Sequence, residues 1–96
     1  MQDTLSTEVT ISAHSRFLSG LQMHGMKPWL LSCAQDGTGA VWDLSGLGEK
    51  HVDVVHSILW NNSILVGACW VHGTDTTLAV ASCSCPVIRV YEAVAG

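Results

Sequence analysis

The stretch Leu30–Leu44 constrains the fold most strongly, because it predicts a β-hairpin. Two runs rich in Val, Leu and Trp flank the polar link Gln35–Thr38, and the pair Asp36-Gly37 stands within that link. An Asp-Gly pair between short apolar runs is a strong hairpin signal, since Gly accepts a positive φ and Asp bonds to nearby backbone groups. We therefore expect antiparallel strands at 29–34 and 39–44.

The rest of the chain has the same character. Further strands are predicted at 7–12, 16–23, 51–57, 64–71, 77–82 and 87–92. These runs are short and rich in β-branched or apolar residues, with Gly, Pro, Asn or Ser between them. No stretch of ten residues has the helical period, and 58–62 is expected to be a linker. The sequence therefore predicts an all-β fold.

The composition favours a folded chain with an uncovered apolar surface. Hydrophobic residues make up 48% of the sequence and mean hydropathy is +0.34, which excludes a disordered chain. Charged residues make up only 12%, about half of the usual share of roughly 25%. Because so little charge is available to coat the exterior, we expect part of the surface to lie against something else.

Charge and hydropathy also exclude several classes of function. The formal net charge is −4 with only four Lys and Arg residues, which argues against nucleic acid or an anionic membrane as partner. The longest apolar stretch, Ile64–Val71, has eight residues, far below the roughly 20 of a transmembrane helix. Met1–Thr4 lacks the pattern of a signal peptide, so we expect a cytoplasmic protein.

The four cysteines suggest a second, competing interpretation. Cys33, Cys69, Cys83 and Cys85 lie in apolar runs, and without signs of secretion we expect small reduced core residues rather than disulfides. Cys83-x-Cys85, together with Cys33, Cys69 and the five His residues, could instead form a small metal- or thiol-binding module. Zinc needs four converging ligands, usually from two Cys or His pairs, and no second pair is present. We expect no bound metal and no cofactor.

Several residues around the hairpin carry a resemblance to a known family. His14 follows Ala13, Ser32 lies in the first strand of the hairpin, Asp36-Gly37 forms its turn, and the second strand closes on Val41-Trp42-Asp43. This arrangement resembles the WD40 repeat, the blade unit of β-propellers. The resemblance implies that His14, Ser32, Asp36 and Trp42 form the structural hydrogen-bond network of that family.

The same side chains admit a catalytic alternative. Ser32, His14 and Asp36 could make a Ser-His-Asp hydrolase triad. The structural interpretation is favoured because Trp42 completes the family's network and no Gly-x-Ser-x-Gly nucleophile elbow is present. We therefore expect no catalytic residues and no enzyme.

The WD40-like pattern recurs once. Aligning Val90-Tyr91-Glu92 with Val41-Trp42-Asp43 gives an offset of 49 residues (91 − 42), close to the roughly 40–45 of a propeller blade. The resemblance implies a partial propeller over 7–94, with a complete blade at 13–57, an incomplete blade at 58–94 and a leading strand at 7–12 from a preceding blade. Residues 1–6 would be a flexible N-terminus and 95–96 a tail.

The second repeat departs from the family pattern. By sequence, Cys85 replaces the turn Asp, Pro86 the Gly, Ala81 the Ser and Tyr91 the Trp, so the network cannot form there. Repeat units of this kind generally need at least three copies for stability. The resemblance therefore implies a C-terminal fragment of a larger propeller, with the remaining blades as partners.

The function that the resemblance implies is that of a non-enzymatic scaffold for protein–protein interaction. Such a scaffold would bind a protein or peptide through loops at 13–16, 35–38, 58–63 and 84–86. Within them the candidate contact residues are Arg16, Gln35, Trp60, Asn61 and Asn62, whereas Trp29 and Trp70 are expected in the core. A truncated product with no independent function is the remaining alternative.

Overall fold

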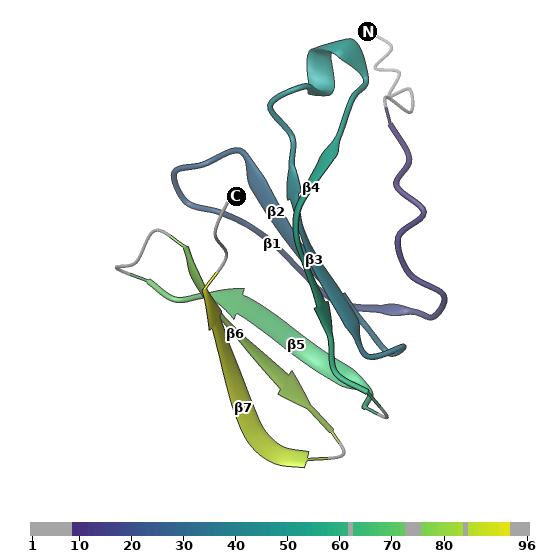
Figure 1. The fold of residues 1–96 in the computed structure, drawn as a ribbon, viewed down its shortest axis with the longest axis vertical. Coiled ribbons are helices and arrows are strands. Elements are labelled where there is room, and N and C mark those ends of the chain that lie inside the picture. The colour runs from purple at the N-terminus through teal and green to yellow at the C-terminus, as the bar shows by residue number, and fades with distance from the viewer. Residues whose placement is uncertain (1–8, 62, 73–75, 84, 93–96) are drawn as a thin grey trace, which may run out of the picture.

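The computed structural model describes residues 9–61, 63–72, 76–83 and 85–92 of the 96-residue chain. These residues form two antiparallel β-sheets, one of four strands and one of three (Figure 1). The helical content of the described residues is a single three-residue 3₁₀ turn, η1 (Leu47–Glu49), in the connection between two strands. The all-β prediction is confirmed.

Each sheet follows the order of the sequence, with neighbouring strands joined as hairpins. The four-stranded sheet contains β1 (Leu18–Met23), β2 (Trp29–Ala34), β3 (Thr38–Asp43) and β4 (Asp53–Leu59). The three-stranded sheet contains β5 (Leu65–Trp70), β6 (Thr77–Ser82) and β7 (Cys85–Glu92). Strands β2 and β6 coincide with the predicted strands at 29–34 and 77–82.

The strand predicted at 7–12 is wrong for the part that the structure describes. Residues 9–12 have no strand assignment, while Thr7 and Glu8, like the predicted segments 1–6 and 95–96, lie outside the described residues. Alternation of polar and apolar residues favours a strand only where a neighbouring strand accepts its backbone hydrogen bonds, and the described chain offers 9–12 no such neighbour.

The linker predicted at 58–62 is also partly wrong. Strand β4 continues to Leu59, which pairs with Thr38, and Ile58 is buried. Because β3 begins immediately after its turn, its first residues need partners, and these come from the far end of β4. Similarly, β7 begins at Cys85, inside the turn predicted at 84–86; Ser84 itself lies outside the described residues.

The two sheets repeat the same strand register. Trp42 pairs with Leu30 in the first sheet, and Tyr91 pairs with Leu78 in the second. The first strands also correspond, since both pairings shift register just before a glycine, at Leu18/Gly20 and at Leu65/Gly67. The shift in the second sheet lies 47 residues after the shift in the first (65 − 18 and 67 − 20). The second sheet is therefore a structural copy of β1, β2 and β3.

This correspondence defines two equivalent faces on each sheet. The front face carries Leu21, Leu30, Ser32 and Trp42 in the four-stranded sheet and Ala68, Leu78, Val80 and Tyr91 in the three-stranded sheet. The back face carries Gly20, Leu31, Cys33 and Val41 in the first and Gly67, Ala79, Ala81 and Val90 in the second. The register places Val80, not the expected Ala81, at the position of Ser32.

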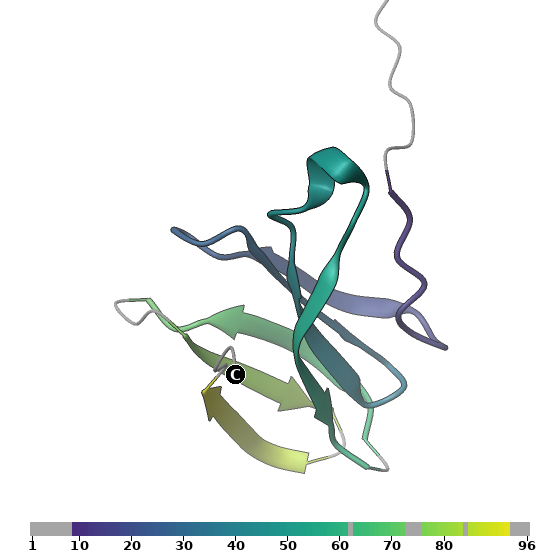
Figure 2. The same cartoon turned by 45° about the horizontal axis from the view of Figure 1, so that its top comes forward.

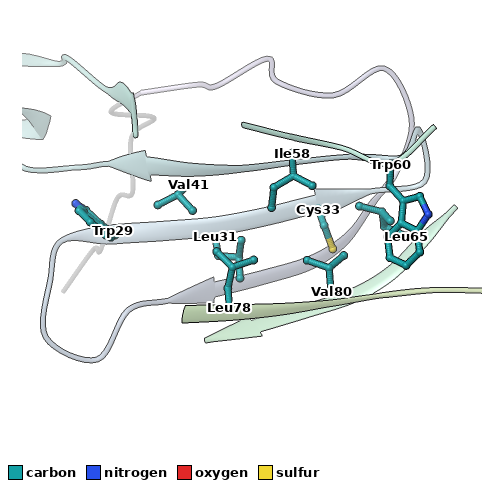
Figure 3. Close-up of a cluster of buried hydrophobic side chains, with 9 residues drawn as sticks. All are labelled: Trp29, Leu31, Cys33, Val41, Ile58, Trp60, Leu65, Leu78 and Val80. Atoms are coloured by element: carbon teal, nitrogen blue, oxygen red, sulfur yellow. The ribbon is translucent and has the colours of Figure 1, made fainter. Parts of the chain in front are cut away.

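The core lies between the back face of the four-stranded sheet and the front face of the three-stranded sheet. Its buried side chains are Trp29, Leu31, Cys33, Val41, Ile58, Trp60, Leu65, Leu78 and Val80. Leu78 and Val80 of β6 point toward Leu31 and Cys33 of β2 (Figure 3). Strand β5 lies against β1 and β2, and Figure 2 shows the two sheets stacked as layers. Burial of these apolar side chains holds the two sheets together.

Candidate functional site

Loops from three parts of the chain converge at one end of the two sheets. The Gly37 carbonyl accepts a hydrogen bond of 2.8 Å from the Trp60 backbone N–H. Gly37 itself has a φ of 82°, and a side chain there would meet the Trp60 and Ser63 carbonyl oxygens. The Gln35 backbone N–H donates to the Phe17 carbonyl at 3.0 Å. Backbone contacts thus join the predicted loops at 35–38 and 58–63 to each other and to Phe17, the residue that follows the predicted loop at 13–16.

A chain of side-chain hydrogen bonds crosses the front face of the four-stranded sheet at this end. The Trp42 indole N–H donates to Ser32 Oγ at 2.9 Å, and Ser32 Oγ lies 3.0 Å from His14 Nε2. On the other side of the ring, His14 Nδ1 lies 2.8 Å from Thr38 Oγ1, whose hydroxyl donates to Asp36. The four residues predicted for the network are therefore brought together, with Thr38 between two of them.

With the Nδ1–H tautomer of His14, the donors and acceptors of this chain give every bond a consistent direction. The Thr38 hydroxyl donates its hydrogen to Asp36, so Thr38 Oγ1 accepts from His14 Nδ1–H. His14 Nε2 is then the acceptor, and it receives the hydroxyl hydrogen of Ser32, which itself accepts from Trp42. A neutral His14 protonated on Nδ1 satisfies all members at once, as a buried polar network requires.

Asp36 holds the other end of the network and the preceding loop. Its carboxylate accepts hydrogen bonds from the Ser15 backbone N–H at 2.9 Å, the Ser15 hydroxyl at 3.1 Å and the Thr38 backbone N–H at 3.0 Å. Desolvation acts to raise the pKa of the Asp36 carboxyl, but the hydrogen bonds from Thr38 and Ser15 hold that pKa well below its ordinary range. Asp36 therefore stays ionised and fixes the position of the loop at Ser15.

Sequence reasoning missed Thr38 and Ser15. An Asp followed two residues later by Thr is a spacing at which an Asp side chain commonly caps the next backbone N–H, so Thr38 carried a readable signal. Ser15 carried none, because its contact with Asp36 joins positions 21 residues apart.

The predicted contact residues have different surroundings. Arg16 and Asn61 are exposed, Gln35 is half-buried, and Asn62 lies outside the described residues. The expectation for Trp60 is wrong, because its side chain is only 5% exposed and belongs to the core cluster. The Arg89 guanidinium lies 4.2 Å from the centre of the Trp60 ring and covers it. Trp60 is therefore a packing residue.

A shallow hollow lies beside this loop. It has a volume of about 470 Å³ and is lined by His14, Ser15, Arg16, Phe17 and Gln35. The Phe17 side chain is 79% exposed, although its backbone carbonyl is bonded to Gln35. A hydrogen-bonded loop thus displays an aromatic ring and a guanidinium group to solvent.

The tryptophans expected in the core are placed as predicted. Trp29 is buried, and Trp70 is half-buried against the core cluster. The Trp70 backbone N–H donates to Gln22 Oε1 at 2.8 Å, and its ring lies edge-on to His24, with ring centroids 4.7 Å apart. These contacts tie β5 to β1 at the end opposite the candidate site.

The cysteines are only partly as expected. Cys33 is a buried core residue, and burial raises the pKa of its thiol. Cys69 and Cys83 are exposed free thiols, so the expectation that they are core residues is wrong. Both lie on the outer side or at the end of the three-stranded sheet, which no layer covers. Among the described residues, no three His, Cys, Asp or Glu side chains lie close enough to hold a metal ion.

A separate side-chain contact lies in the connection before β4. His51 Nε2 lies 2.8 Å from Asp53 Oδ1, and both side chains are largely exposed. Exposed pairs of this kind contribute little to stability. The contact fixes the connection before β4 and lies away from the candidate site.

Neither a known family model nor a curated protein matches the chain. No helix in the part of the chain that the structure describes has the length and apolarity needed to cross a membrane.

Proposed function

We propose that the chain is part of a WD40-type β-propeller and acts as a non-enzymatic scaffold for a protein or peptide partner. The observation that carries this proposal is the network from Trp42 through Ser32, His14 and Thr38 to Asp36. It contains the residue types of the WD40 network, each from the expected strand or loop. The repeated register of the two sheets supports the same proposal.

The geometry of Ser32 and His14 supports a structural role for them. Ser32 is only 4% exposed, and its oxygen already receives the Trp42 indole N–H. A hydrolytic serine must instead reach a substrate. The Thr38 hydroxyl also lies between His14 and Asp36, whose nearest nitrogen and oxygen are 3.7 Å apart. This geometry supports a role in holding the loop at His14 and Ser15 against the turn at Asp36, rather than in preparing a nucleophile.

The loop end is the proposed binding surface. Asp36 and Gln35 fix the loop that carries Arg16 and Phe17, so little conformational entropy is lost when a partner binds there. An exposed aromatic ring beside an Arg side chain is a common composition for a binding hot spot. The hollow of about 470 Å³ provides a concave contact next to them.

A site-specific photo-cross-linking experiment tests this proposal. A benzoylphenylalanine at Phe17 is compared with one at Met26, an equally accessible residue at the opposite end of β1. We expect discrete protein adducts from position 17 only, and their loss when Arg16→Glu and Gln35→Glu are added. Equal adducts from both positions, or adducts that persist after these two changes, would contradict the proposal.

A further inference from the structure

In the part of the chain that the structure describes, no further sheet covers two of the sheet faces. On the front face of the four-stranded sheet, Leu18, Leu21, Met23, Val54 and Leu59 are each more than half exposed. On the back face of the three-stranded sheet, Ile88 and Val90 are equally exposed beside Cys69, Ala79 and Ala81. The side chains named here are uncharged, and Glu92 lies at one edge of the three-stranded sheet. These surfaces therefore suit an apolar partner surface better than a charged one.

The two open faces are the two halves of the contact that the chain already makes internally. The register makes Ala79, Ala81 and Val90 equivalent to Leu31, Cys33 and Val41, which are core residues. It likewise makes Leu21, Leu30 and Trp42 equivalent to Ala68, Leu78 and Tyr91, which pack against that core. One chain therefore buries one back-to-front contact and leaves a second back face and a second front face unused.

Each of the open faces has a hollow. The back face of the three-stranded sheet has a hollow of about 300 Å³ over small residues of β5 and β6, among them Gly67, Ala79 and Ala81. The front face of the four-stranded sheet has a hollow of about 370 Å³ bordered by Trp42, Val54 and Leu59. Residues 11, 13 and 14 lie over another part of that face, beside Leu21 and Leu30.

If two copies stack as the two sheets of one chain do, large side chains lie opposite both hollows. If β5 of one molecule lies along β1 of another, Leu21 and Met23 face the hollow over β5 and β6. The equivalence of β7 with β3 then places Ile88 and Val90 opposite the hollow beside Trp42. Large side chains on each face thus lie opposite a hollow in the other face, as close packing requires.

We propose that a second copy of this chain covers these faces, with the back face of one three-stranded sheet packed on the front face of the next four-stranded sheet. This inference rests on the proposed propeller-type role and names the source of the further sheets. The contact joins two different surfaces, so it is a head-to-tail contact that leaves one open face at each end of a dimer. Repetition of that contact adds further copies.

Residues 9–12 support the choice of a second copy. The offset of 47 makes them equivalent to residues 56–59 of β4 (56 − 47 = 9), which pair with β3. Residues 9–12 pair with none of the described strands. Strand β7, the equivalent of β3, likewise has no described strand on its outer side. In a head-to-tail contact of this type, the unpaired segment of one copy lies along the unpaired edge of the other.

Light scattering coupled to size-exclusion chromatography tests the proposal with two single variants. Ile88→Glu introduces a charge on the back face and Leu21→Glu on the front face; these residues are 69% and 62% exposed, so both substitutions leave the core intact. We expect the unaltered chain to reach at least twice the mass of one chain as its concentration rises, and each variant to stay at the mass of one chain. Met26→Glu, at an exposed turn, is the matched control and should associate normally.

An equimolar mixture of the two variants gives the sharper result. Each retains one intact face, so the mixture should form a complex of two chains and stop there. Circular dichroism checks folding, and Leu21→Ser and Ile88→Ser replace any variant that unfolds. A wild-type chain that stays monomeric, a mixture that stays monomeric, or association lost in only one variant overturns the proposal. Cross-linking at Phe17 reports separately on the loop surface, so failure of that role is distinguishable.

Discussion

Gly20 of β1 lies directly against Gly67 of β5 where the two sheets meet. A β-carbon placed on Gly20 would be 3.5 Å from the Gly67 Cα, 3.2 Å from the Ala68 nitrogen and 2.8 Å from the Cys33 sulfur. A β-carbon placed on Gly67, in contrast, would meet no atom within 4 Å. The two glycines occupy equivalent register positions, but adding a side chain should destabilise the fold more at Gly20 than at Gly67.

This difference gives the first prediction. Gly20→Ala should lower the free energy of unfolding by about 1–3 kcal/mol, because the added methyl overpacks the contact between the sheets. Gly67→Ala should change it by less than about 1 kcal/mol. Urea denaturation at low protein concentration measures both. Adding Cys33→Ala to Gly20→Ala removes the nearest clash, so a double variant no more stable than its Gly20→Ala parent would contradict this explanation.

A second prediction concerns the turn glycine. Gly37→Ala should destabilise the fold by more than about 1–2 kcal/mol, the cost of a left-handed conformation alone, since its β-carbon would also lie 2.6 Å from the Trp60 carbonyl oxygen. Gly37→Asn tolerates the positive φ but has the same β-carbon, so it separates the two causes. We expect both variants to be similarly unstable in urea, and Gly48→Ala, at an open position, to be nearly neutral. A stable Gly37→Asn variant would show that conformation alone matters.

The third prediction tests the bridging hydroxyl. Thr38→Val keeps the shape of the side chain but removes the group between His14 and Asp36, and should cost about 1–3 kcal/mol because buried partners lose a hydrogen bond. Thr38→Ser retains the hydroxyl and should recover most of this stability. Nitrogen-15 NMR of His14 should show the neutral Nδ1–H form in the unaltered chain. A ring protonated only on Nε2 would contradict the bond directions described above.

The fourth prediction concerns pH. Because folding lowers the pKa of Asp36, its ionised form contributes stability above the unfolded pKa of about 3.9. That contribution is lost as the pH falls below this value through the folded pKa. The stability difference between the unaltered chain and Asp36→Asn should therefore be constant near neutral pH and shrink below about pH 4. Urea titrations at several pH values measure it, and a difference that grows on acidification would disprove the stabilising role of the carboxylate.

The sequence was most informative where local chemistry and tertiary structure agree. The Asp36-Gly37 turn, the strands at 29–34 and 77–82, and the grouping of His14, Ser32, Asp36 and Trp42 were all predicted correctly. A turn is specified by its own residues, and a buried strand by its apolar run. The family resemblance supplied the grouping around His14, which no local pattern contains.

Errors arose where a distant partner decides the outcome. Residues 9–12 alternate like a strand but have no neighbour in the described chain, whereas Ile58 and Leu59 become strand because β3 needs a partner. Trp60 looked like a contact residue beside two Asn residues, yet Arg89 covers it from a strand 29 positions away (89 − 60). Strand pairing and burial of this kind depend on contacts that a local window does not contain.

Trp60 also links the β2–β3 hairpin to the last described strand. Its backbone N–H holds the Gly37 carbonyl, while its ring lies under Arg89 of the last strand. The turn at Asp36 is therefore held by a residue that β7 in turn covers. During translation, this support is complete only after Arg89 has been synthesised, although the turn residues themselves come much earlier in the sequence.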